Sequence, residues 1–211
     1  MIPIHKSGDR SIVTNCRPVS LTSVVSKQME HVIASYLRQV WDKNDWLYEG
    51  QHGFRPGYSC ESQVITVCQD IADCLDNGDK IDAVIVDFSK DFDLVPHGRF
   101  LTKTANSGVD SRVVVWIREY LLGRIQRGRV GGQLRVRSDV PQGSVLGPLL
   151  FLAYVNGIWR DMESTIRLFV DDCVIYIKII HNADMEKLQK NLDRLGEWAA
   201  AYLSCTLRLL R

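Results

Sequence analysis

Two apolar runs enclose a pair of acids in the stretch Arg167-Leu168-Phe169-Val170-Asp171-Asp172-Cys173-Val174-Ile175-Tyr176-Ile177. The runs are short and rich in β-branched and aromatic residues, which favours strands. The acids between them are common turn residues. The stretch therefore predicts a β-hairpin with a tight turn at Asp171-Asp172. Taken alone, these two carboxylates could simply be solvated acids of a surface turn.

A third acid changes that interpretation. Asp87 closes a predicted strand over residues 81–88, whose segment Ala83-Val84-Ile85-Val86 offers no polar position to solvent. Carboxylates that converge from a strand end and a hairpin tip repel each other, and unpaired buried charge is costly. Divalent cations remove the difficulty. Hard oxygen ligands without nearby His or Cys suit Mg²⁺, and two such ions can promote phosphoryl or nucleotidyl transfer.

The other predicted elements are helices and one more hairpin. Apolar spacing predicts helices over residues 20–40, after Ser59, over 111–122, over 148–155 and near the C-terminus, with a hairpin over 126–136. Ser23 and Ser59 are the predicted N-caps, and Asn77-Gly78 ends the second helix. Because helices and hairpins do not alternate strictly, the α+β class is favoured. The predicted buried positions of the first two helices are Val25, Met29, Val32, Ile33, Tyr36, Leu37 and Val40, then Val64, Val67, Ile71 and Leu75.

Composition argues against membrane insertion and secretion. The longest apolar stretches of the 211 residues fall far short of the ~20 that a bilayer span needs. The N-terminus has no apolar segment followed by a cleavage site. The six cysteines form no Cys-x-x-Cys pair, which argues against structural zinc, and Cys68 and Cys74 are predicted to be buried thiols. We therefore expect an intracellular protein, nuclear or cytoplasmic.

The net charge of +1 hides a strong segregation along the chain. Residues 61–98 carry 9 acidic and 2 basic side chains, whereas residues 99–137 carry 9 basic and 2 acidic ones. Solvated helix faces would explain either block. The basic block, however, is mostly arginine, which binds phosphate through two parallel hydrogen bonds. The acidic block runs into the strand that ends at Asp87. The pattern favours a polyanionic partner for the basic block.

Six longer motifs occur in order. They are Pro3-Ile4-His5-Lys6-Ser7-Gly8-Asp9-Arg10, Asn15-Cys16-Arg17-Pro18-Val19-Ser20-Leu21, Gln51-His52-Gly53-Phe54-Arg55, Val86-Asp87-Phe88-Ser89-Lys90-Asp91-Phe92-Asp93, Val140-Pro141-Gln142-Gly143-Ser144-Val145-Leu146-Gly147 and Phe169-Val170-Asp171-Asp172. Together they resemble the motifs of reverse transcriptases from non-LTR (LINE-type, jockey-like) retrotransposons. The resemblance covers nearly the whole chain.

The resemblance implies a right-hand polymerase fold. Fingers would occupy about residues 1–80 and 100–138, and the palm about 81–99 and 139–205, with the catalytic Asp-Asp hairpin in the palm sheet. A chain of 211 residues is expected to hold fingers and palm only, with the thumb absent. The implied activity is RNA-directed DNA synthesis, in which a dNTP is added to a primer 3′-hydroxyl on an RNA template. The partners would be RNA, a DNA primer and dNTPs; the sequence does not indicate an oligomeric state.

The same resemblance assigns roles to individual residues. Asp87 and Asp171 would hold two Mg²⁺ ions, and Asp172 would complete the catalytic triad. Phe92 would be a steric gate against the ribose 2′-hydroxyl, although a core phenylalanine is the simplest alternative. Lys6 and Arg17 would hold the triphosphate, although Lys6 could equally be a solvated surface lysine. The remaining assignments are Gln142 and Gly143 at the templating base and nucleotide, and Arg55, Arg124, Arg127 and Arg129 on nucleic acid.

Some positions depart from the family pattern. Asp91 replaces a small residue and adds an acid near Asp87, and Gly157 stands where an acid is common. Val170 replaces the usual alanine, and the lysine expected after Trp198 is absent. These departures leave a catalytically inactive nucleic-acid-binding remnant as an alternative. A two-metal phosphohydrolase is a weaker one, because Phe92 and the Gln142-Gly143 segment give no reason to expect it.

Overall fold

The computed structural model describes residues 2–9, 12, 15–88, 97–122, 126–129, 133–136, 143–202 and 207–210. The chain divides into two compact units, each built from two segments. The first unit comprises Met1–Trp46 and Phe92–Tyr154, and the second comprises Leu47–Asp91 and Val155–Arg211. None of the helices in the described part of the chain combines the length and apolar character that a membrane crossing requires.

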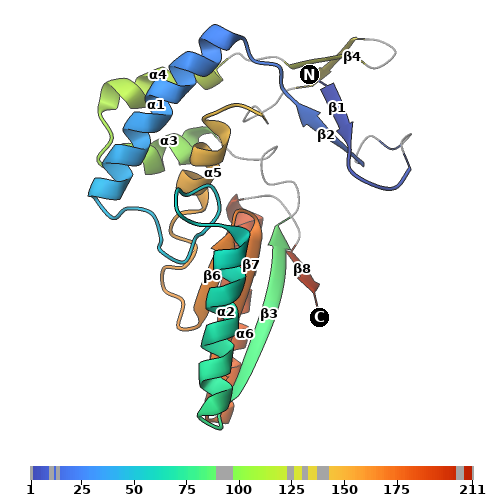
Figure 1. The fold of residues 1–211 in the computed structure, drawn as a ribbon, viewed down its shortest axis with the longest axis vertical. Helices are drawn as coiled ribbons and strands as arrows, with labels where there is room; N and C mark the ends of the chain where they lie inside the picture. Colours follow the sequence, from blue (N-terminus) through green and yellow to red (C-terminus); the bar gives the residue numbers. More distant parts are fainter. Residues whose placement is uncertain are drawn as a thin grey trace. The chain divides into compact units, whose positions relative to one another are not determined.

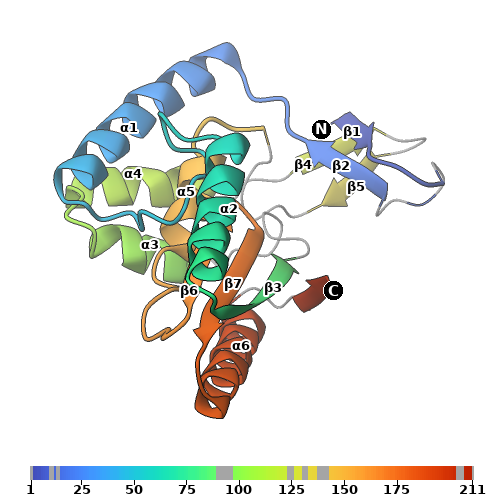
Figure 2. The same ribbon diagram turned by 60° about the horizontal axis from the view of Figure 1, so that its bottom comes forward.

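The second unit is built on a four-stranded antiparallel sheet. Its order is β6-β7-β3-β8, and every neighbouring pair is antiparallel. Helices α2 and α6 lie on opposite faces of this sheet (Figures 1 and 2). The bounds are α2 (Cys60–Asp76), β3 (Lys80–Phe88), β6 (Thr165–Phe169), β7 (Asp172–Ile179), α6 (Asn182–Tyr202) and β8 (Leu207–Leu210). Helices and hairpins are thus mixed without strict alternation, and the α+β prediction is confirmed.

Helix α2 begins where the sequence predicts. The Ser59 hydroxyl accepts from the Ser62 N–H, and the Ser62 hydroxyl accepts from the Ser59 N–H, a reciprocal cap that satisfies two helix-start donors. Its predicted buried face is wrong, because Val64 and Leu75 are exposed whereas Gln63 is buried. Cys68 is exposed as well, which corrects the expectation of a buried thiol.

A half-buried polar network joins α2 to the sheet. The Arg167 guanidinium donates to the Asp70 carboxylate at 2.8 Å and to the Tyr176 hydroxyl at 3.2 Å, and Tyr176 also donates to Asp70. Burial and the Asp70 hydrogen bond raise the pKa of Tyr176 to about 12. Asp70 thus replaces the apolar contact that helical spacing predicted for this face of α2.

The first unit contains four helices and two small sheets in its described part. Strands β1 (Ile2–His5) and β2 (Cys16–Val19) pair with each other, as do β4 (Gln126–Arg129) and β5 (Gln133–Val136). The β4–β5 pair confirms the predicted hairpin. The helices are α1 (Val24–Lys43), α3 (His97–Ala105), α4 (Ser111–Leu121) and α5 (Gly147–Val155). Helix α3 was not predicted, because its nine residues hold few large apolar side chains.

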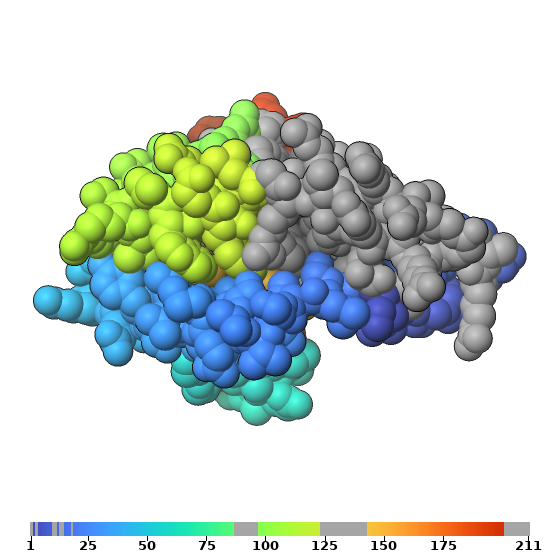
Figure 3. Space-filling model, turned by 90° about the horizontal axis from the view of Figure 1, so that it is seen from above, coloured from blue at the N-terminus to red at the C-terminus, as the bar shows by residue number. Residues whose placement is uncertain are grey.

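Helix α1 confirms its predicted cap, and its predicted face only in part, since Leu37 is buried but Val25, Met29 and Val32 are exposed. The Ser23 hydroxyl accepts from the Ser26 N–H. The buried residues are Glu30, Ala34, Leu37 and Trp41, while Val25 stays 75% exposed. The Trp41 indole donates to the Ser107 hydroxyl at 2.8 Å. In Figure 3, α1 (blue) lies alongside the α3–α4 region (yellow-green) of the same unit.

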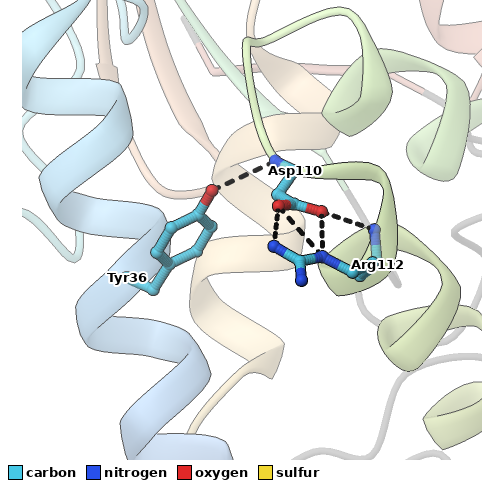
Figure 4. A network of polar contacts seen from close by, with 3 residues as sticks. All are labelled: Tyr36, Asp110 and Arg112. Carbon is cyan, nitrogen blue, oxygen red and sulfur yellow. Dashed lines mark hydrogen bonds and ion pairs between the residues drawn. The ribbon is translucent and has the colours of Figure 1, made fainter.

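A second contact fixes α1 to the start of α4 (Figure 4). The Tyr36 hydroxyl accepts from the Asp110 N–H at 3.1 Å. The Asp110 carboxylate caps α4 by accepting from the Arg112 N–H at 2.8 Å, and it also accepts from the Arg112 guanidinium. These hydrogen bonds lower the pKa of Asp110 to about 2. Asp110 therefore caps α4 with its side chain and bonds to α1 through its backbone N–H.

Candidate active site

A tight hairpin carries the Asp171-Asp172 pair. Phe169 of β6 pairs with Asp172 of β7, so only Val170 and Asp171 form the turn. The predicted turn at Asp171-Asp172 is therefore displaced by one residue, since Asp172 already belongs to a strand. Asp171 is half-buried and Asp172 is exposed.

Register brings the third acid to the same place. In the β3–β7 ladder, Val86 pairs with Cys173 and Asp87 pairs with Asp172. Strands β3 and β7 lie side by side (Figure 2). Asp87 and the Asp171-Asp172 pair, which are more than 80 positions apart in the sequence, therefore meet at one end of the sheet. The predicted convergence of strand end and hairpin tip is confirmed for the backbone.

The burial on which that expectation depended is confirmed only in part, since Val86 is fully buried but the β3 residues before it are not. Ile85 of β3 is 45% exposed and Ala83 is exposed, because α2 covers only part of this sheet face. Asp172 is likewise open to solvent. Repulsion between neighbouring carboxylates, rather than their desolvation, is thus the feature that favours a cation here.

The donor chemistry at this end of the sheet fits a divalent cation. Asp171 and Asp172 offer hard carboxylate oxygens, the ligands that Mg²⁺ prefers. Among the side chains that the structure describes, no three His, Cys, Asp or Glu residues form a ready cluster. The Asp87 side chain lies outside that set, so only its backbone position is established.

Residues 50–53 form an extra backbone contact beside the hairpin. The Leu168 N–H donates to the Gly50 carbonyl at 2.8 Å, and the His52 N–H donates to the Leu168 carbonyl at 2.9 Å. Gln51 and Leu168 thereby form a parallel bridge. This segment overlaps the motif that begins at Gln51, but the spacing of residues in that motif does not indicate that it adds to the sheet edge at β6.

The Gln51 side chain bonds directly to the turn. Its Oε1 accepts from the Val170 N–H at 3.0 Å and from the Gly53 N–H at 2.8 Å, and its Nε2 donates to the Val170 carbonyl at 3.4 Å. Gln51 is only 3% exposed. Sequence reasoning missed this residue. The sequence contains one feature that could have indicated it, a large polar side chain between the closely packed glycines Gly50 and Gly53.

Gly53 touches the same turn. A Cβ at Gly53 would lie 2.5 Å from both the Val170 Cγ2 and the Val170 backbone nitrogen. Real Cβ atoms do not approach a backbone nitrogen so closely, so no larger residue fits without moving the hairpin.

Arg55 completes this loop. Its Nη1 donates to the Tyr48 carbonyl at 2.8 Å and to the Gln51 carbonyl at 3.4 Å, and its guanidinium lies 4.7 Å from the Tyr58 ring centroid. These contacts give Arg55 a structural task that the sequence did not indicate. A contact of Arg55 with nucleic acid stays a prediction.

Three predicted nucleotide-binding residues lie in the described part of the first unit. Lys6 follows β1 and Arg17 lies in β2, and both side chains are exposed. Gly143 has a φ of +89°, and a Cβ there would lie 3.0 Å from Val19 Cγ1. Gly143 is therefore a position where the backbone passes close to the end of β2.

Other predicted site residues lie outside the described residues. They are Phe92, Arg124 and Gln142. Arg127 and Arg129 have described backbones in β4, but their side chains lie outside the description.

Comparison with known proteins identifies the family. The profile described as "Reverse transcriptase (RNA-dependent DNA polymerase)" matches residues 4–206. The chain belongs to the reverse transcriptase family. The resemblance found in the motifs is confirmed, and the family assignment covers both units.

Relatives within the reverse transcriptase family come from Drosophila melanogaster mobile elements. The chain is 28% identical to a probable RNA-directed DNA polymerase from transposon BS, over 96% of this chain and 24% of that protein. It is 29% identical to the corresponding protein of transposon X-element, over 93% and 23%. The chain thus spans about a quarter of the length of these curated relatives. Both support a LINE-type reverse transcriptase domain.

A solved structure supports the polymerase fold. Telomerase from Candida albicans, solved in complex with a fragment of telomeric RNA, superposes with a TM-score of 0.56 at 14% identity, covering 89% of this chain and 36% of that one. At this identity the likeness concerns the fold alone. The fingers and palm limits predicted from the motifs remain a prediction.

Proposed function

We propose that this chain catalyses RNA-directed DNA synthesis, adding dNTPs to the 3′-hydroxyl of a DNA primer on an RNA template. The observation that carries the proposal is the β3–β7 register, which sets Asp87 opposite Asp172 at the end of the hairpin. Family membership supplies the reaction class, and the acids at this sheet end supply a place for it.

Asp87, Asp171 and Asp172 would hold two Mg²⁺ ions, which when bound activate the attacking hydroxyl and stabilise the leaving oxygen. The solvent access of Asp172 suits this role, because Mg²⁺ keeps several waters and takes its remaining ligands from substrate phosphates. The three carboxylates thereby orient the primer end against the triphosphate.

The remaining residues would bind and orient the substrates. Lys6 would contact the triphosphate as a point charge and Arg17 as a bidentate donor, and both are exposed and available. Gly143, with its close backbone approach, would support the templating base together with Gln142. Phe92 would exclude the ribose 2′-hydroxyl. Arg55, Arg124, Arg127 and Arg129 would contact nucleic-acid phosphates.

A specific observation keeps the inactive remnant as the second candidate. Asp91 adds an acid four positions after Asp87 in the sequence, where the motif usually has a small residue. Such a chain would bind primer–template without extending it.

One assay separates the candidates. The chain is incubated with an RNA template, a DNA primer, dNTPs and Mg²⁺, beside an Asp171→Ala/Asp172→Ala control. Extension that disappears in the control supports the polymerase, and binding without extension supports the remnant. Phosphate release that needs no primer would instead indicate a phosphohydrolase.

A further inference from the structure

The turn that presents Asp171 has an unusual backbone. Val170 has a φ of +60°. In a two-residue hairpin turn, a positive φ at the first position favours glycine, and a β-branched residue rarely adopts it. This conformation persists only where surrounding contacts hold it. The Val170 side chain also contacts Gly53, so the turn does not relax freely.

Gln51 supplies those contacts. Both polar groups of its buried carboxamide reach the Val170 peptide groups, with Oε1 accepting from the N–H and Nε2 donating to the carbonyl. Oε1 also accepts from the Gly53 N–H. No other uncharged side chain of this length offers both a donor and an acceptor in this arrangement.

The segment that carries Gln51 is itself firmly placed. Backbone hydrogen bonds from Gly50 and His52 attach it to Leu168, two residues before Val170. A Cβ at Gly50 would lie 2.5 Å from the Tyr48 ring, so a larger residue there would have to displace that ring. The Tyr48 hydroxyl donates to the Ile166 carbonyl at 2.8 Å, which adds a third attachment to β6.

We propose that Gln51 is a positioning residue for Asp171. It holds Val170 in the left-handed conformation and thereby fixes the backbone from which the next residue, Asp171, projects beside Asp172. The proposal rests on the proposed polymerase function, because that function gives Asp171 its role. The loop at residues 50–53 thereby has a role in catalysis, although it is distant from the acids in the sequence.

The decisive variant is Gln51→Met, which keeps the length and burial but removes all three hydrogen bonds. Gln63→Met is the matched control, since Gln63 is also buried in the second unit and its carboxamide has no hydrogen-bond partner among the described residues. The third variant is Gln51→Met/Val170→Gly, in which glycine adopts the positive φ without needing support.

Four quantities are measured for each variant. They are the rate of single-nucleotide addition, the thermal unfolding midpoint, Mn²⁺ binding by electron paramagnetic resonance, and amide hydrogen exchange at Val170. A misplaced carboxylate is expected to lower the addition rate of Gln51→Met about 100-fold. Mn²⁺ binding should weaken and the Val170 amide should exchange faster. Gln63→Met should match the wild-type chain, and the added Val170→Gly should restore most of the rate.

Unchanged addition and Mn²⁺ binding in Gln51→Met would overturn the proposal. So would an equal loss in Gln63→Met, or a loss that follows the unfolding midpoint and resists Val170→Gly. If the wild-type chain neither extends primer nor binds Mn²⁺, the polymerase function fails, and the role of Gln51 in positioning a catalytic acid fails with it. In that case faster exchange at Val170 would leave Gln51 only a structural support of the turn.

Discussion

Single residues at this site were predicted unevenly. The three aspartates were found because Asp87, at the end of an apolar strand, was expected to converge with the two acids of the hairpin, and the register of β3 and β7 confirms this for the backbone. Gln51 was missed, because a glutamine in a glycine-rich loop is unremarkable until its partners are known. Its hydrogen bonds are to Val170 and Gly53, and the contact with Val170 spans 119 positions of sequence.

Gly53 gives a test at the residue scale. In Gly53→Ala the new methyl group would meet the Val170 nitrogen, which no side-chain rotation relieves. We expect a loss of about 1–3 kcal/mol in the free energy of unfolding, the usual cost of overpacking, and a lower extension rate. Urea denaturation measures the first and primer extension the second. Gly98→Ala, where no atom lies within 4 Å of the added Cβ and the φ is not positive, separates the collision from loss of backbone freedom.

Phe92 gives a second residue-scale test. The proposed steric gate places the Phe92 ring beneath the sugar of the incoming nucleotide, so a smaller side chain there would remove the clash with a 2′-hydroxyl. Phe92→Val is therefore expected to raise ribonucleotide use relative to dNTP use about tenfold or more. Competition between rNTP and dNTP in primer extension measures it, with Phe92→Tyr, which keeps the ring, as the control. Unchanged sugar discrimination would remove Phe92 from the site.

At the scale of elements, helix caps were predicted well, and helix faces only in part. Ser23 and Ser59 cap their helices as expected, since a cap depends on local sequence. The buried faces of α1 and α2 depend on tertiary partners. In α1 the core side includes Glu30, which apolar periodicity excludes.

Glu30 anchors the segment between Gly143 and α5. Its buried carboxylate accepts from the Val145 N–H at 2.7 Å and the Leu146 N–H at 3.2 Å. Glu30→Ala would leave one buried and one part-buried donor without this acceptor, which should cost about 3 kcal/mol of unfolding free energy. Glu30→Gln keeps an acceptor and should cost less. Denaturation curves that show equal losses for both variants would contradict this role.

Helix α6 gives a pH-dependent prediction. The Asp184 carboxylate accepts from the His181 and Ile180 N–H groups and from Lys187, and these contacts hold the pKa of Asp184 below its ordinary value. Because the folded pKa is depressed, the stabilisation is complete above the ordinary value and is lost as pH falls through the folded one. Asp184→Asn should lower the thermal unfolding midpoint by a few degrees at neutral pH.

That difference should shrink steadily below about pH 4. Circular dichroism melts at several pH values measure it, with the exposed Glu186→Gln as control. A midpoint difference that stays constant down to strong acid would show that Asp184 acts through packing rather than through its charge.

At the scale of the molecule, the sequence predicted the α+β class, and the motif resemblance predicted the family and an interleaved division into fingers and palm whose limits stay a prediction. The α+β class follows from element order, and six ordered motifs indicated the family that comparison confirms. The two compact units interleave along the chain, with Leu47–Asp91 joining the sheet. Sequence periodicity contains no signal for such a division, because it is set by which distant segments contact each other.

Charge segregation belongs to this scale too. The basic block over residues 99–137 is expected to contact template phosphates. Binding to RNA–DNA primer–template should therefore weaken about 100-fold or more between about 50 and 200 mM salt. Arg127→Ala/Arg129→Ala should reduce that salt slope, whereas Arg160→Ala, an exposed arginine outside the block, should not. Fluorescence anisotropy measures both, and an affinity that is flat with salt would contradict phosphate contact.

The most direct test is the rate of a single dNTP addition to a DNA primer on an RNA template in Mg²⁺, compared between Asp171→Asn and Asp76→Asn. Asp76 is an exposed acid at the end of α2. It lies four residues before Lys80, which pairs with Ile179 at the opposite end of the β3–β7 ladder from Asp172. The proposed role of Asp171 requires its variant to lose about 1,000-fold in rate with primer–template binding intact, while Asp76→Asn keeps the wild-type rate. Equal rates for the two variants, or a wild-type chain that binds primer–template and adds nothing, would contradict it.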